Sequence, residues 1–170
     1  NGCATWDSSE TSLLWTARGW GGDGMWTAFD SLGGTETAGY WITESQSGNL
    51  NCSSGGADGP VSACSPAWGT DSADWSTPVV IDQFHCTATQ CKNLLVGGDR
   101  VFSATEYGAP TYPATSTTIL PGTAAAGSVV SLAWARSEPK AASAGTDNGK
   151  WWWAENVFTG FNLFSIALEI

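Results

Sequence analysis

The sequence predicts an all-β fold, either a single-domain antiparallel β-sandwich of jelly-roll-like type or a closed barrel, with long disulfide-stapled loops. Three observations support this prediction. Short strand-like segments alternate with turn residues, almost no segment shows a sustained 3.6-residue apolar stripe, and the five cysteines lack the C-x-x-C spacing of a metal site. A chain of 170 residues fits one domain, which we place at 1–170.

Ten segments have the composition of strands, and ten strands in one domain indicate a sandwich or a barrel. In chain order they are 12–17, 25–31, 39–44, 78–86, 92–96, 100–107, 116–120, 128–136, 149–155 and 161–170. The last of them alternates apolar and other residues cleanly, which predicts a central strand. A helix over 123–138 is the one rival, favoured by its alanines and opposed by Gly127 and the Val129-Val130 pair.

Glycine and proline cluster between these segments, as turns require. Asn148-Gly149 is the strongest hairpin-turn signal in the chain. The stretch from Asn49 to Ser76 is the least regular, with two cysteines, two prolines and many serines. It is interpreted as a long surface loop stapled by a disulfide, a kind of loop that often carries function.

The cysteines indicate an exported, extracellular protein with disulfide bonds. We predict the pairs Cys52–Cys64 and Cys86–Cys91, because each closes a short loop of small polar residues. Cys3 is then left over and available for an intermolecular disulfide or a small thiol. The alternative is that Cys3 pairs inside the chain and another cysteine is buried.

The charge balance narrows the choice of partners. Sixteen acidic residues against six basic ones give a net charge of −10, which repels phosphate backbones and anionic lipid. No nucleic acid partner is expected, and no apolar run reaches the roughly 20 residues of a membrane span. The opening residues lack an initiator Met and a signal peptide, which is expected of a mature, processed product.

Eleven tryptophans are the most distinctive feature of the composition. In the run Gly149–Glu155, a strand would put Trp151, Trp153 and Glu155 on one face and Trp152 on the other. An exposed indole beside a carboxylate suits a sugar, whose C–H face packs on the ring while its hydroxyls bond the acid. The alternative is that both faces are covered and the indoles are core.

A second aromatic group surrounds the glycine-rich turn at 20–24. Trp20, Trp26, Trp41 and Asp23 are its candidate ligand-binding residues, joined by Trp15 and Tyr40. Large indoles beside a flexible turn form either a core anchor or the rim of a pocket. In a barrel, the pocket would hold an apolar molecule in its mouth.

Catalytic signals are weaker, and no catalytic residue is assigned. As parts of one strand, Gln83 and His85 would share a face, an arrangement that a polysaccharide lyase could use, although a hydrogen-bonded structural histidine is the plainer interpretation. A glycosidase would need two carboxylates, for which Glu106, Glu138 and Glu155 are candidates. No cofactor or metal is expected, apart from a structural calcium ion at acidic turns. The candidate turns hold Asp71 and Asp74, Asp147 with Asn148, and Asp7 with Glu10.

These observations favour a secreted, lectin-like protein that binds a glycan or polysaccharide through exposed Trp side chains. Two alternatives stay open, namely a small extracellular polysaccharide-degrading enzyme and a secreted effector or inhibitor that binds a protein.

Overall fold

The computed structural model describes residues 23–33, 38–66, 73–91, 93–104 and 127–157, together with the backbone of three short strands at 4–5, 16–17 and 117–118. Every regular element in these residues is a strand, which confirms the all-β prediction. The strands are β1 (Ala4–Thr5), β2 (Thr16–Ala17), β3 (Trp26–Phe29), β4 (Trp41–Glu44), β5 (Leu50–Ser53), β6 (Ser62–Ala63), β7 (Val79–Ile81), β8 (Leu94–Gly97), β9 (Val101–Ala104), β10 (Thr117–Thr118), β11 (Val129–Trp134), β12 (Ala142–Thr146) and β13 (Trp151–Ala154).

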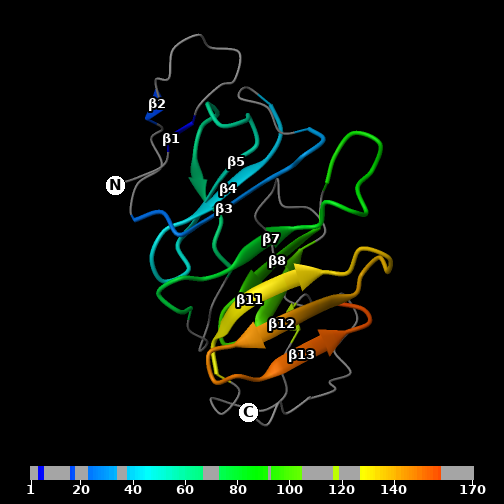
Figure 1. Cartoon of the computed structure of the whole chain (residues 1–170). Coiled ribbons are helices and arrows are strands. Elements are labelled where there is room, and N and C mark those ends of the chain that lie inside the picture. The colour runs from blue at the N-terminus through cyan, green and yellow to red at the C-terminus, as the bar shows by residue number, and fades with distance from the viewer. Residues whose placement is uncertain are drawn as a thin grey trace.

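The strands form three larger antiparallel sheets and one two-stranded ladder, β1–β2 (Figure 1). The first sheet has the order β3-β4-β5-β6, the middle sheet β10-β9-β8-β7, and the last sheet β11-β12-β13. None of these sheets closes on itself within the described residues, so the barrel alternative is wrong there. The jelly-roll order of strands and the single domain stay predictions.

The middle sheet is buried on both faces. Its strands β7 and β8 have continuous apolar runs, Val79-Val80-Ile81 and Leu94-Leu95-Val96, and such runs are typical of strands without a solvated face. Successive side chains point to opposite faces, so each run supplies two cores at once. The first sheet covers one face and the last sheet covers the other, which gives three layers.

Two separate cores follow from this layering. Between the first and middle sheets lie Ala28, Ile42, Leu50, Cys52, Cys64, Val79, Ile81, Cys91, Leu94, Val96, Phe102 and Ala104. Between the middle and last sheets lie Leu95, Val101, Val129, Trp134, Ala142, Ala144, Trp152, Ala154 and Val157. The outer faces of the first and last sheets therefore point in opposite directions, away from the two cores.

The sequence prediction missed four strands, β1, β5, β6 and β12, and extended the strand at β7 too far. The stretch 49–76 is not a plain loop, because β5 and β6 within it extend the first sheet. The fourth missed strand is β12, whose Ala, Ser and Gly have low strand propensity, yet it pairs with β11 on one side and β13 on the other. Conversely, β7 ends at Ile81 and not at Cys86.

The helix alternative over 123–138 is wrong where it can be compared, because β11 occupies 129–134 in extended conformation. The β-branched pair Val129-Val130 outweighs the helix propensity of the alanines once β12 is there to pair with. The apolar segment at 161–170 lies outside the described residues.

Both predicted disulfides are present. Cys52–Cys64 ties β5 to the residue after β6, and Cys86–Cys91 closes the turn before β8. Cys3 lies outside the described residues. None of the described residues forms a helix that is long and apolar enough to cross a membrane.

Candidate functional site

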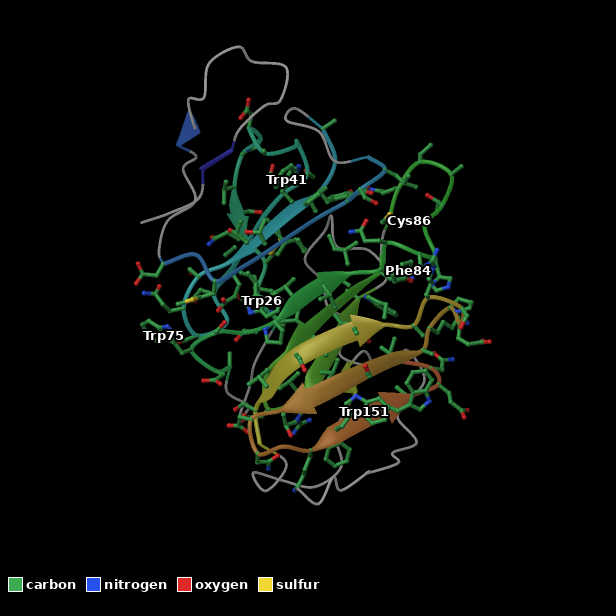
Figure 2. All side chains as sticks on the ribbon, viewed as in Figure 1. Trp26, Trp41, Trp75, Phe84, Cys86 and Trp151 are labelled. Carbon is green, nitrogen blue, oxygen red and sulfur yellow. A yellow bond between two sulfur atoms is a disulfide. The ribbon has the colours of Figure 1, made fainter. Side chains whose placement is uncertain are left out.

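The outer face of the last sheet holds a group of exposed aromatic residues. Along β13, exposure alternates with the strand period: Trp151 is 38% exposed and Trp153 half-buried, whereas Trp152 between them is only 7% exposed and belongs to the core. Glu155, directly after the strand, is exposed and follows the same parity. Trp151 and Trp153 thus lie on the solvated side of β13, and Glu155 is exposed just beyond its end. Figure 2 shows Trp151 on the last sheet.

The neighbours of these indoles on the same face are small and uncharged. Across the ladder, Trp151 is paired with Gly145 and Trp153 with Ser143 on β12. These residues are in turn paired with Ser131 and Ala133 on β11. The Ser131 hydroxyl leans over Gly145 so closely that an added Cβ at Gly145 would lie 2.5 Å from it. Ser131, Ala133, Ser143 and Gly145 therefore form a floor of short side chains, and the two indoles project along one side of it. We call this surface the Trp151 face.

Charged residues sit at the two ends of this face. The β11–β12 turn carries Arg136, Glu138 and Lys140, at the end where Glu155 leaves β13. The β12–β13 turn carries Asp147 and Lys150 at the other end. Acidic and basic residues balance over 127–157, three of each, whereas the whole chain has a net charge of −10. The Trp151 face therefore belongs to an electrically neutral part of an acidic protein.

The β12–β13 turn confirms the hairpin predicted at Asn148-Gly149. Thr146 donates its backbone N–H to the Lys150 carbonyl, and Gly149 donates to the Thr146 carbonyl. Gly149 has a φ of 78°, a left-handed conformation that glycine adopts without strain. This turn sets the register that aligns Trp151 with Gly145.

The second predicted aromatic group does not form one site. Trp26 points inward, packs against the core between the first and middle sheets, and donates its indole N–H to the Ser76 hydroxyl at 3.0 Å. Trp41 is on the outer face of the same sheet, where it stacks on Phe29 with ring centroids 5.1 Å apart. Asp23 accepts a hydrogen bond from the Gln46 amide at 3.1 Å. Trp20 and Trp15 lie outside the described residues.

Phe29 was not a candidate in the sequence, although it is 45% exposed and directly opposite Trp41 in the ladder. The sequence could have identified Phe29, because side chains alternate between the two faces of a strand. In the predicted strand 25–31, Phe29 is therefore on the face opposite to Trp26 and Ala28. Figure 2 shows Trp41 and Trp151 far apart, in the upper and lower parts of the molecule.

The Gln83/His85 pair on one strand face is a wrong prediction, because the chain turns after Ile81. The buried Asp82 carboxylate organises this turn: it accepts the backbone N–H groups of Phe84 and His85 and bonds the His85 ring at 3.0 Å. His85 is thus the hydrogen-bonded structural histidine of the plainer interpretation. Gln83 points instead to the end of β3.

Gln83 joins the first sheet to the middle sheet through two hydrogen bonds. Its amide nitrogen donates to the Phe29 carbonyl at 2.8 Å, and its amide oxygen accepts the Ser31 N–H at 3.2 Å. We expect Gln83→Ala to lower the free energy of unfolding by about 1–2 kcal/mol, since both bonds are lost. Urea denaturation measures this. Gln90→Ala is the matched control and should change the value by less than about 0.5 kcal/mol. Equal effects of the two variants would contradict this role of Gln83.

Between β3 and β7 runs a groove of about 240 Å³. Its lining consists of consecutive residues of both strands, namely Trp26, Thr27, Ala28, Phe29, Val79, Val80, Ile81 and Gln83. Consecutive rather than alternate residues indicate that the groove follows the edges of the two strands. Val79, Ile81 and Ala28 are largely buried in the core, so the groove offers few polar side chains to a ligand.

The candidate carboxylates have different surroundings. Glu138 and Glu155 are both exposed at one end of the last sheet, and Glu106 lies outside the described residues. Glu44, at the end of β4, is a fully buried carboxylate that the sequence did not single out. Burial raises the pKa of Glu44 to about 7, although hydrogen bonds from the backbone N–H groups of Gly48 and Thr77 act in the opposite direction.

The acidic turns proposed for calcium are used for local hydrogen bonds where the structure describes them. Asp74 accepts the N–H of Trp75, and Asp147 accepts the N–H of Ser128. Asp71, Asp7 and Glu10 lie outside the described residues. No group of three or more His, Cys, Asp or Glu side chains suited to a metal ion occurs in the described part of the chain.

Comparison with known proteins gives no match: no family model, no curated protein and no solved structure matches this chain.

Proposed function

We propose that this protein binds carbohydrate as a secreted, lectin-like domain, and that the Trp151 face is its binding surface. The observation that carries the proposal is the pair Trp151 and Trp153 on a solvated sheet face whose other residues are small and uncharged. An indole offers a flat apolar surface to the C–H groups of a sugar ring. Gly145 and Ser143 beside the rings leave room for such a ligand to approach.

Polar groups beside the rings complete the chemistry that a sugar needs. Glu155 is exposed directly after β13, and the hydroxyls of Ser131 and Ser143 lie on the floor. These groups accept and donate hydrogen bonds to sugar hydroxyls without imposing a charge on the middle of the face. The two disulfides are compatible with export to an oxidising compartment, which supports the extracellular location.

Binding is tested on an array of plant, fungal and animal glycans, followed by tryptophan fluorescence titration of each hit. We expect the protein to bind at least one class of carbohydrate and to leave it intact. The double variant Trp151→Ala/Trp153→Ala should bind at least about tenfold more weakly, because buried Trp contacts dominate binding energy.

Trp75→Ala is the matched control, since Trp75 is 57% exposed but lies away from the last sheet (Figure 2). Its binding should stay within about twofold of the unmodified protein, a difference of less than about 0.5 kcal/mol. Unchanged binding by the double variant would remove the site from the Trp151 face. Shortened polymer would indicate an enzyme, and no binding to any glycan would favour a protein partner.

A further inference from the structure

The two indoles of the Trp151 face form a row along β13, and the exposed Glu155 follows just beyond the end of the strand. A strand rises about 3.3–3.4 Å per residue, so the Cα atoms of Trp151 and Trp153 are about 6.7 Å apart. A single sugar ring contacts one indole at a time. A ligand that contacts both indoles and the carboxylate must be elongated and must run parallel to the strand.

The face has a floor but no walls. Ser131, Ala133, Ser143 and Gly145 are too short to enclose a small sugar from the β12 side. Beyond Trp151 the end of the row is open, because a Cβ placed on Gly149 would meet no atom within 4 Å. Small-molecule sites are concave and cover most of their ligand, so this open shape fits a segment of a long chain better than a free monosaccharide.

The backbone of β13 adds polar groups in the same row. Among the described strands, β13 is at the edge of the last sheet (Figure 1), with β12 as its partner. The Thr146 to Lys150 hydrogen bond sets the ladder so that Trp152 and Ala154 face β12. The N–H and C=O groups of Trp151 and Trp153 then point away from β12. These backbone groups belong to the same alternate residues as the two indoles, so they recur along the strand at the same interval.

Charge restricts the ligand further. Residues 127–157 are neutral overall, and the rest of the chain carries the entire net charge of −10. A polymer with carboxylate or sulfate groups would gain no attraction from this face and would be repelled by the protein as a whole.

From these observations we infer that the ligand of the Trp151 face is an extended, uncharged polysaccharide chain that lies along β13, with successive sugars on Trp151 and Trp153 and hydroxyls on the strand edge. This inference rests on the proposed function and specifies its ligand. The site recognises an internal stretch of the polysaccharide and not a chain end or a single sugar.

Oligomer series of one to six sugars test the inference, with β-1,4-glucan, β-1,3-glucan, mannan and chitin as the probes and isothermal titration calorimetry as the measurement. In at least one series, affinity should rise at least about tenfold between the monosaccharide and the hexasaccharide, because the second ring is engaged only by a chain of two or more sugars. Trp153→Ala should lower the hexasaccharide affinity to the monosaccharide level and leave the monosaccharide affinity within about twofold. A carboxymethylated form of the same glucan should bind more weakly than the neutral form.

The outcomes separate this inference from the proposed function. A monosaccharide that binds as tightly as the hexasaccharide would overturn the extended chain and leave carbohydrate binding intact. Preference for the carboxymethylated glucan would overturn the uncharged ligand. Absence of binding in all four series would overturn the inference even if another glycan on the array is bound. Absence of binding to every glycan on the array would overturn both the inference and the proposed function.

Discussion

Trp152→Ala is expected to lower the free energy of unfolding by about 3–5 kcal/mol, whereas Trp151→Ala, one residue earlier, should lower it by about 1 kcal/mol or less. The difference follows from the strand period: Trp152 is 7% exposed and packs between the middle and last sheets, and Trp151 is 38% exposed on the outer face. Removing the buried indole leaves a cavity that the surrounding strands cannot fill. Equilibrium unfolding in guanidinium chloride measures both variants.

A third variant separates packing from hydrogen bonding at this position. The indole N–H of Trp152 is buried and has no partner among the described residues. Trp152→Phe removes that donor while keeping most of the ring volume, so it should destabilise clearly less than Trp152→Ala. If Trp151→Ala costs as much as Trp152→Ala, the assignment of inner and outer faces on β13 is wrong, and the Trp151 face loses its basis as a ligand site.

Glu44 is expected to make the protein less stable as the pH rises from about 4.5 to 7. The folded state holds the proton of this carboxyl up to a pKa of about 7, whereas the carboxyl in an unfolded chain titrates at 4.5. Between these values the folded state binds more protons than the unfolded state, so stability decreases with rising pH. The raised pKa corresponds to about 3 kcal/mol, fully present below pH 4.5 and lost above pH 7.

Glu44→Gln tests this dependence, because the amide cannot ionise and its oxygen can still accept the Gly48 N–H that Glu44 accepts at 3.1 Å. The loss of stability between pH 4.5 and pH 8, measured by urea denaturation, should be smaller in the variant by about 3 kcal/mol. Glu138→Gln is the matched control, because it makes the same substitution at an exposed carboxylate. The same pH dependence in Glu44→Gln and the unmodified protein would show that another group is responsible.

Predictions from local chemistry agreed with the structure where neighbouring residues decide the outcome. The two disulfides close loops with sequence separations of 12 and 5, so small polar residues between the cysteines were enough to predict them. The Asn148-Gly149 hairpin is equally local, because a tight turn needs only one residue with positive φ. The opposite directions of Trp152 and its two neighbours follow from the period of any strand.

Predictions failed where a residue's role depends on a distant partner. β12 has a sequence, Ala-Ser-Ala-Gly-Thr, that no strand propensity favours, and it is a strand because two neighbouring strands pair with it. Without β12 the floor of the Trp151 face could not be predicted. Glu44 could not be recognised in the sequence either, since its raised pKa comes from burial in the folded protein.

The amino-acid sequence by itself determined the all-β class, both disulfides, the hairpin turn and the alternation along β13, because turn geometry, loop closure and strand period act within a few residues. Only the tertiary structure decided which side of each strand meets water. It put Trp26 in a core and Trp41 on a surface, turned Asp82 and His85 toward each other, and left Trp151 exposed. Burial depends on which sheets pack together, and that packing joins residues far apart in the chain.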